Sequence, residues 1–279
     1  MAKKVGFLKK MLRRKEAVFG ASLLIIMGLL AVLAPWISPY PYAEMNIMDA
    51  FQGPSMAHPL GTDNLGRDLL SRIMYGGRFS LTVGIISVAI SAGGGLIFGS
   101  IAGYFGGRVD NLIMRFMDIF NAIPQVLLAV CISAALGPGF FKTVLAVGIG
   151  GIPNFSRVIR ANILSVRKID YVEAAESINC SKPRVIFRHV VPNAITPFLV
   201  QCTLAMANGL IVSATLSYIG LGVQPPLPEW GAMLSDARNY IRQYPYLLIA
   251  PGVFIMITVL SFNLIGDAVR DALDPKLKK

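Results

Sequence analysis

The chain has 279 residues, of which 54% are hydrophobic and only 15% are charged. Soluble domains carry about 25% charged residues, so this composition, with a mean hydropathy of +0.62, excludes an ordinary soluble protein and favours one that crosses a bilayer. The net charge of +11 comes from basic residues at the ends of apolar runs. Because the chain lacks basic-aromatic surfaces and zinc-ligand spacing, we expect no nucleic-acid partner.

Six apolar segments are candidates for membrane-spanning helices, each of which needs roughly 20 mainly apolar residues. The first, at 17–37, is longer than the core of a secretion signal, and Pro35 follows its only plausible cleavage site at Ala34, so we expect a retained helix. The fourth is the weakest, because it contains Lys142, several glycines and a proline. The five later segments cover residues 79–102, 119–136, 141–159, 195–221 and 246–265.

The basic residues predict how these spans are oriented. With six crossings and the amino terminus inside, twenty Lys and Arg residues lie inside and six lie outside, as the positive-inside rule requires. Omitting the fourth crossing would move the late basic loop and tail outside. We therefore expect an all-α integral membrane protein with six transmembrane helices and cytoplasmic N- and C-termini. Its expected parts are a cytoplasmic tail at 1–16, the first transmembrane helix at 17–37, an extracytoplasmic loop at 38–78, a core of five transmembrane helices at 79–268 and a cytoplasmic tail at 269–279.

Small residues recur near the end of the second span. Gly95, Gly99 and Gly103 are spaced by four residues, which places them along one face of a helix. Small residues let two membrane helices approach closely, so we expect a helix-packing face there. Gly107, four residues further on, belongs to the turn that follows.

The sequence offers no candidate for catalysis or metal binding. It contains no phosphate-binding G-x-x-x-x-G-K-[ST] loop, no G-x-S-x-G elbow and no H-E-x-x-H pair. The two histidines, His58 and His189, fall on opposite predicted sides. The middles of the spans contain no ionisable residue, whereas such residues usually mark proton or ion relays. We therefore expect a protein that is not an enzyme, binds no cofactor and takes its energy from elsewhere.

The cytoplasmic loop at about 156–196 is too long and too patterned for a simple connector. Residues 171–178 are predicted to form a short helix, with Asp170 as its cap. Asn179 follows, and Asn is the best substitute for Gly where a helix ends in a left-handed conformation.

A second short helix is predicted after this turn. Ser181 offers a new cap and Pro183 suits a first helical turn, so the helix would run over residues 184–192. The loop is thus predicted to fold as helix, turn, helix on the cytoplasmic side.

Aromatic residues follow the fifth span. Trp230 and Tyr240 lie on the predicted outer side, and amphipathic rings gather at the level of the lipid headgroups. We expect them to anchor a short outer segment at the interface.

The loop resembles the EAA loop of ATP-binding-cassette (ABC) importer permeases, through Glu173-Ala174-Ala175 and, further on, Asn179, His189 and Pro192. The family usually has Gly at the position of Asn179. Nearly the whole chain is similar to the oligopeptide, dipeptide and nickel branch of that family, and its layout resembles the C-type permease subunit. The supporting segments are 58–68, 188–193, 217–222, 230–236 and 266–275.

The resemblance implies a type I ABC importer permease in the bacterial cytoplasmic (inner) membrane, which translocates di- and oligopeptides. Implied partners are a second, different permease subunit, two cytoplasmic ATPases that carry ATP and magnesium, an extracytoplasmic binding protein and membrane lipid. Nickel chelates or glutathione are alternative cargoes. A self-sufficient carrier or channel is an alternative class, but we find neither an inverted repeat nor buried coupling groups. The resemblance assigns ATPase docking to Tyr171, Glu173, Ala174, Ala175, Ile178, Asn179, Arg188, His189 and Pro192.

Overall fold

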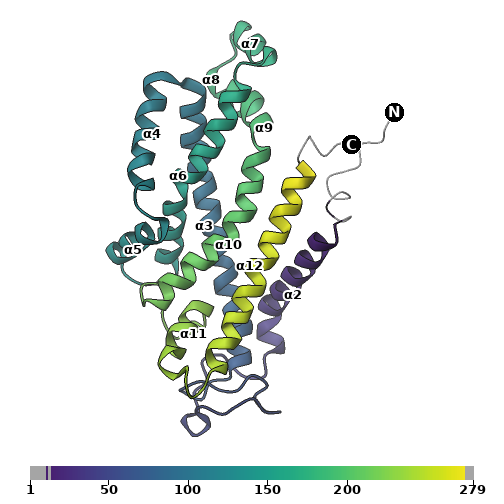
Figure 1. Ribbon diagram of the computed structural model, residues 1–279, viewed down its shortest axis with the longest axis vertical. Coiled ribbons are helices and arrows are strands. Elements are labelled where there is room, and N and C mark those ends of the chain that lie inside the picture. The colour runs from purple at the N-terminus through teal and green to yellow at the C-terminus, as the bar shows by residue number, and fades with distance from the viewer. Residues whose placement is uncertain (1–10, 12–13, 274–279) are drawn as a thin grey trace.

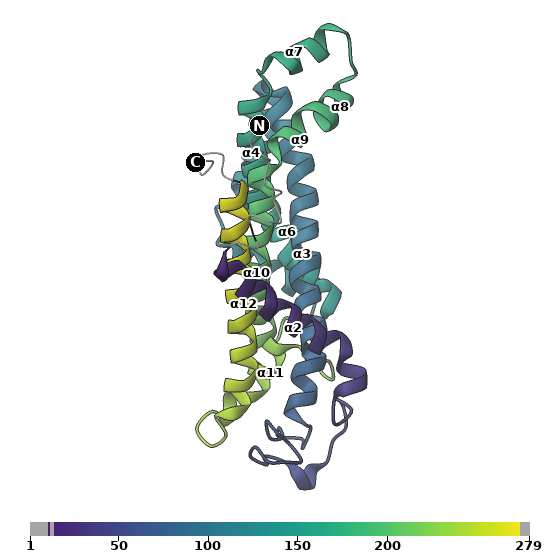
Figure 2. The same ribbon diagram turned by 90° about the vertical axis from the view of Figure 1, so that its right-hand side faces the viewer.

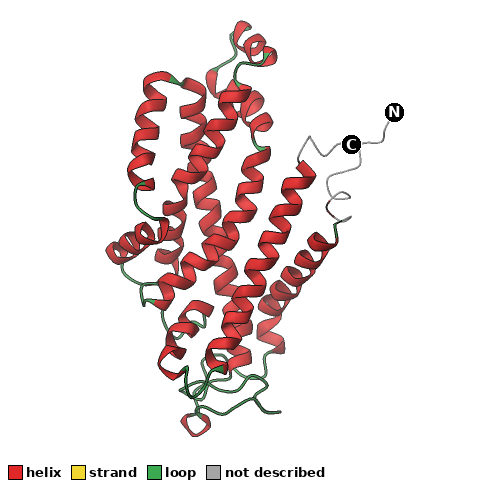
Figure 3. Cartoon of the chain, viewed as in Figure 1, coloured by secondary structure: helices red, strands yellow, loops and turns green. Residues whose placement is uncertain are grey.

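The protein is an elongated bundle of helices, seen here in a computed structural model that describes residue 11 and residues 14–273. The expected tails at 1–16 and 269–279 lie largely outside these residues. In the described part of the chain, β structure is limited to one isolated bridge between Thr62 and Asp68, and Figure 3 shows helices joined by loops. The expected all-α fold is confirmed.

The helices follow one another along the chain, and the longest connection between described helices covers residues 38–68 (Figure 1). The loop predicted at about 156–196 is called the inner loop, and it contains a π-helical turn at Val185–Val190. Single 3₁₀ turns lie at Ile47–Asp49 and Arg238–Tyr240. The helices are α2 (Lys15–Ile37), α3 (Leu69–Phe105), α4 (Gly107–Asn121), α5 (Gln125–Leu136), α6 (Phe140–Val166), α7 (Asp170–Ser177), α8 (Lys182–Arg184), α9 (Val191–Ala194), α10 (Thr196–Tyr218), α11 (Trp230–Ala237) and α12 (Tyr246–Leu273).

Among the described residues, the four helices α2, α3, α10 and α12 are each long and apolar enough to cross a membrane. They correspond to the first, second, fifth and sixth predicted spans. The third prediction, a continuous helix over 119–136, is wrong: α4 and α5 meet there at an angle of 87°. Pro124 lies at the break and accounts for it, because proline lacks a backbone N–H and disfavours helical geometry in the residue before it. The fourth predicted segment, 141–159, lies within α6. This helix is less apolar than α2, α3, α10 and α12.

α3 begins ten residues earlier than its predicted span. A carboxylate oxygen of Asp68 accepts a hydrogen bond of 2.7 Å from the N–H of Ser71, and this bond caps the helix. Gly106 ends it at a positive φ of +65°, which glycine adopts without steric cost. At 37 residues, α3 is about 55 Å long and extends beyond a hydrocarbon core of about 30 Å.

α3 and α6 are parallel neighbours whose backbones touch through the predicted glycine face. A Cβ atom at Gly95 would lie 2.2 Å from Cβ of Phe155, and one at Gly99 would lie 2.1 Å from Cγ2 of Ile159. Gly103 meets α6 in the same way one turn further on. Because the contacts advance in the same direction along both helices, α3 and α6 run parallel. A Cβ at Gly107 would meet open space. Gly107, which we predicted to lie in the turn, is the first residue of α4, and Gly106 alone separates it from α3.

The bundle has two distinct ends. The inner loop with α7 projects at one end (Figure 2). The loop between α2 and α3, residues 38–68, is called the outer loop and lies with α11 at the other end. The start of α2 and the end of α12 are joined by an ion pair between Arg14 and Asp271. One buried cluster packs the inner loop onto α6 and α10, and another packs α11 and the outer loop onto α2, α3 and α12.

Candidate functional site

The short helix α7 carries the central residues of the inner loop. Its buried side chains, Val172 and Ala175, pack into a core shared with α6 and the second half of the loop. Asp170 does not cap the helix as predicted. It is the first helical residue, and Ile169, which precedes it, has no side chain able to form a cap bond. An acidic residue in the first turn is nonetheless favourable, because the helix dipole is positive there.

The end of α7 has the geometry that the sequence predicts. Asn179 adopts φ +58°, and its N–H donates a hydrogen bond of 2.9 Å to the carbonyl of Glu176. The N–H of Cys180 donates to the carbonyl of Ala175 at 3.2 Å. These two bonds form a Schellman motif, which satisfies carbonyls that the helix leaves free and reverses the chain.

The opposite face of α7 is exposed and partly apolar. Tyr171 is 38% exposed and Ile178 is 77% exposed, and Ala174 lies between them on the same face. This spacing of three and then four residues is the one by which a helix anchors in a groove of a partner. Glu173 is also exposed, next to this stripe. Ala175, predicted for the docking surface, is instead buried in the core of the loop itself.

The second half of the loop is helical throughout, although not as one α-helix. α8, the π-helical turn and α9 cover residues 182–194 and pass the predicted end at 192. Arg188 and Pro192 are exposed, and His189 is half-buried. The carbonyl of His189 accepts a hydrogen bond of 2.7 Å from the side-chain amide of Asn193. Ser181 precedes α8 without the side-chain cap bond that we expected.

Contacts that the sequence reasoning missed tie the loop to the end of α3. The hydroxyl of Tyr104 donates a hydrogen bond of 2.5 Å to Oε1 of Glu176. Nη1 of Arg167, just after α6, donates to the carbonyls of Gly103 at 3.0 Å and Tyr104 at 3.3 Å. A positive charge at the carboxyl end of a helix is favourable. Polarity alone could not reveal these pairs, because the partners lie more than sixty residues apart.

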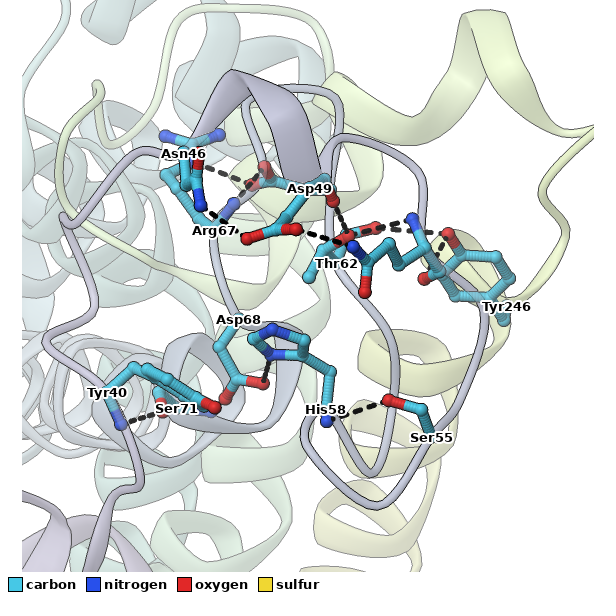
Figure 4. A network of polar contacts seen from close by, with 12 residues as sticks. Tyr40, Asn46, Asp49, Ser55, His58, Thr62, Arg67, Asp68, Ser71 and Tyr246 are labelled. Carbon is cyan, nitrogen blue, oxygen red and sulfur yellow. Dashed lines mark hydrogen bonds and ion pairs between the residues drawn. The ribbon is translucent and has the colours of Figure 1, made fainter.

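At the outer end, the signature segment 58–68 folds into a buried polar network (Figure 4). Nδ1 of His58 lies 3.0 Å from Oδ1 of Asp68, the residue that caps α3. Nε of Arg67 donates to Asp63 at 2.6 Å, and Nη2 of Arg67 lies 3.6 Å from Asp236 in α11. The sequence showed this segment only as a resemblance; the structure shows that it attaches the outer loop to α3 and α11.

Trp230 corrects one prediction. It is only 2% exposed, and its indole N–H donates to the carbonyl of Ile73 at 2.9 Å, so it joins α11 to α3 and does not anchor the chain at the interface. Its neighbour Glu229 caps α11 by accepting from the N–H of Ala232 at 2.9 Å, and it also accepts from the hydroxyl of Ser80 at 3.3 Å. Burial raises the pKa of Glu229, although its hydrogen bonds oppose this change.

Tyr240, the other predicted interface anchor, is also drawn into the protein. Its ring packs edge-on against Phe51 of the outer loop, with 4.9 Å between ring centroids. Tyr244 stacks on the same ring at 4.4 Å. The aromatic residues after α11 thus hold the outer loop.

Two family models match the sequence. One is described as the inner membrane component of binding-protein-dependent transport systems and matches residues 95–279. The other is described as the N-terminal TM domain of oligopeptide transport permease C and matches residues 6–54.

Similar curated proteins are bacterial transport permeases. The dipeptide transport system permease protein DppC of Alkalihalophilus pseudofirmus is 43% identical, over 97% of this chain and 89% of the relative. The glutathione transport system permease protein GsiD of Pectobacterium atrosepticum is 41% identical, over 98% and 91%. The oligopeptide transport system permease protein OppC of Bacillus subtilis is 39% identical, over 95% and 87%.

Solved structures share the fold at low sequence identity. A structure of inward-facing conformations of the MetNI methionine ABC transporter matches with a TM-score of 0.59 and 16% identity, over 73% of this chain and 96% of that one. A structure of an amino acid ABC transporter with histidines matches with a TM-score of 0.52 and 17% identity, over 68% and 89%.

Proposed function

Since the chain belongs to the family of inner membrane components of binding-protein-dependent transport systems, we propose that it carries peptides as one of two different permease subunits of an ABC importer. Membership makes the chain a multi-pass permease subunit of the bacterial inner membrane and not an enzyme. It also implies ATPase and binding-protein partners. The importer class is thereby favoured over a self-sufficient carrier.

Peptides are the proposed cargo. Relatives at 43% and 39% identity are named for dipeptide and oligopeptide transport, and each matches nearly the full length of this chain. Glutathione, itself a small peptide, is a second candidate because a relative named for it is 41% identical.

The parallel packing of α3 and α6 supports six membrane crossings. α6 follows α3 from Gly148 to Ile163, a length of about 24 Å, which is most of a hydrocarbon core of about 30 Å. Because the two helices run in the same direction, the chain between them must return across the bilayer, and the bent pair α4 and α5 makes this return. With six crossings and the amino terminus inside, as the positive-inside rule favours, α7 and the carboxyl terminus would also lie on the cytoplasmic side.

The inner loop is the proposed docking site for an ATPase, and the exposed stripe of α7 carries this proposal. Tyr171, Ala174 and Ile178 present an apolar face in the cytoplasm, where no lipid would cover it, and Glu173 lies beside them for a basic partner group. Ala175 holds the helix in the core of the loop, and Asn179 ends it. Arg188, His189 and Pro192, in the second half of the loop, are further proposed contacts of the ATPase.

The same contacts suggest how ATP acts on the permease. Two ATPases, with ATP and magnesium bound to them, would close together and move the docked α7. Tyr104 connects α7 with α3, and Arg167 connects the root of the loop with the same helix end. Movement of the loop would therefore reach the two parallel helices together.

Co-purification tests the assembly. The chain, tagged at its carboxyl terminus and gently extracted from its own membrane, is expected to bring a second permease and one or two ATPases, identified by mass spectrometry. Recovery of the chain alone, under conditions that preserve a known importer complex, would contradict the proposal.

A charge reversal tests the docking face. Glu173→Lys is expected to leave membrane insertion intact but to uncouple ATP hydrolysis from uptake in proteoliposomes. Ile178→Ser should weaken ATPase binding by removing an apolar anchor. Ser177→Ala, an exposed change on the same helix, is the control. Normal coupled uptake in both Glu173→Lys and Ile178→Ser would refute the docking role.

A further inference from the structure

Midway along the bundle, a cavity of about 290 Å³ lies between α3, α5, α6 and α10. Pockets that hold small ligands commonly measure about 300–1,000 Å³, so this cavity suits a short segment of a ligand. Its polar lining consists of Ser87, Ser91, Gln125, Asn154, Gln201 and Asn208.

The two serines of the lining have their hydroxyls engaged by backbone. Ser87 donates to the carbonyl of Val83 at 2.6 Å. Ser91 donates to the carbonyl of Gly148 at 2.7 Å and thereby links α3 with α6. These side chains support the wall of the cavity and leave recognition to the amides.

The four amides keep free hydrogen-bonding groups. The amino group of Asn208 donates to Oε1 of Gln125 at 2.9 Å, which leaves the carbonyl of Asn208 and the amino group of Gln125 available. Within the part of the chain that the structure describes, Asn154 and Gln201 form no side-chain hydrogen bond. Asn154 and Asn208 are exposed, so both can reach a molecule that enters the cavity.

The presence of four amide side chains midway along helices that are mainly apolar needs an explanation. A polar group in an apolar environment without a partner is unfavourable, and polar side chains inside membrane bundles commonly face a binding site or a water-filled path. The lining contains no Asp, Glu, Lys, Arg or His. The cavity therefore offers donors and acceptors without a charge to select or reject a ligand.

We propose that Gln125, Asn154, Gln201 and Asn208 bind the backbone of a peptide in transit. A side-chain amide has the same donor and acceptor groups as a peptide bond, so its carbonyl accepts a backbone N–H and its amino group donates to a backbone C=O. Because every peptide has this backbone, the site accepts peptides with different side chains. This site rests on the proposed function and specifies which part of the cargo the chain contacts.

The test compares a peptide with an analogue in which one backbone N–H is replaced by N–CH₃. Uptake is measured with the complete importer in proteoliposomes, including its binding protein. The binding protein discriminates equally for every permease variant, so a change in the ratio of the two uptake rates reports this chain. The wild-type importer is expected to take up the parent peptide faster.

The amide-free variants Gln125→Met, Asn154→Leu, Gln201→Met and Asn208→Leu keep approximate size. Where the lost amide accepted the methylated N–H, the ratio should fall by about two- to tenfold, the value of one hydrogen bond. Asn111→Leu, which removes an exposed amide from α4, should leave the ratio unchanged. A series of analogues, each methylated at a different backbone nitrogen of the peptide, is tested against every variant. Each side-chain amide is thereby compared with each peptide N–H that it could accept.

A second measurement uses the wild-type importer and does not depend on variant assembly. A photoreactive peptide, held in the complex by a non-hydrolysable ATP analogue, should cross-link to α6 and α10 around Asn154 and Gln201. Cross-links that avoid the cavity, or ratios unchanged in all four variants, would overturn this site while peptide uptake persists. Absence of peptide uptake by the wild-type importer would instead overturn the proposed function.

Discussion

The hydroxyl of Tyr104, at the inner end of α3, donates a hydrogen bond of 2.5 Å to the carboxylate of Glu176 in α7. The two residues are 72 positions apart. Glu176 also supplies the backbone carbonyl that accepts the N–H of Asn179, where α7 ends. Glu176 thus both helps to end α7 and attaches it to the membrane-spanning helix α3.

Removal of this hydrogen bond should weaken coupling. Tyr104→Phe keeps the ring and its packing but loses the hydroxyl, so the complex should assemble while less uptake occurs per ATP hydrolysed. The measurement is uptake and ATPase activity in the same proteoliposomes. Glu176→Gln, which retains an acceptor, should preserve more coupling than Tyr104→Phe, and equal coupling in wild type and Tyr104→Phe would contradict this role.

The glycine face should tolerate no side chain. At Gly99, a Cβ would lie 2.1 Å from Ile159 and 2.4 Å from the backbone carbonyl of Ser156, so Gly99→Leu must separate α3 from α6. We expect a loss of several degrees in melting temperature in detergent, in line with the penalty of about 1–3 kcal/mol or more for overpacking. Gly93→Leu is the matched control, because nothing lies within 4 Å of a Cβ there.

The raised pKa of Glu229 predicts a pH-dependent stability. The unfolded carboxyl has the ordinary pKa of 4.5, and the folded one has a higher pKa, so the folded state holds a proton more tightly. This contribution is fully present below pH 4.5 and is lost as the pH rises through the folded-state pKa. Glu229→Gln removes the titration.

The difference in melting temperature between wild type and Glu229→Gln isolates this effect from other titrating groups. It should move in favour of the variant as the pH rises from 4.5 toward neutrality. A difference that stays constant over this range would show that Glu229 does not change its protonation there.

A bidentate ion pair should hold α4 against α6. Nε and Nη2 of Arg160 lie 2.5 and 2.6 Å from the two carboxylate oxygens of Asp110. Asp110→Asn should lower the free energy of unfolding by about 1.5–3 kcal/mol, the range for hydrogen bonds to charged groups. The pair between Arg157 and Asp118 is more exposed, with side chains 47% and 56% accessible, so Asp118→Asn should change it by about 0–1 kcal/mol.

Thermal unfolding in detergent measures how much Asp110→Asn and Asp118→Asn each lower the stability of the protein. A double exchange, Asp110→Arg with Arg160→Asp, should recover part of the loss. Equal effects of Asp110→Asn and Asp118→Asn would show that burial adds nothing to the first pair.

Features that depend on neighbouring residues could be predicted from the sequence. The end of α7 at Asn179 is such a feature, because every hydrogen bond of its Schellman motif lies within six consecutive residues. The four most apolar helices are another, because transfer of a continuous apolar run into lipid depends on its composition alone. The four-residue glycine spacing likewise places small residues on one face whatever helix lies opposite.

Only the tertiary structure decided which distant residues meet. Trp230 is of a residue type that often anchors a chain at the membrane interface, but the carbonyl of Ile73, 157 positions away, accepts its indole N–H. Pro124 marks a break in the sequence, yet the angle of 87° between α4 and α5 depends on how these helices pack against α6. Gln125 and Asn208 read separately as isolated polar residues, and their shared cavity exists only because α5 and α10 converge. Local sequence determines the free energy of a helix and its transfer into lipid, whereas pairing between distant side chains depends on packing that no local pattern contains.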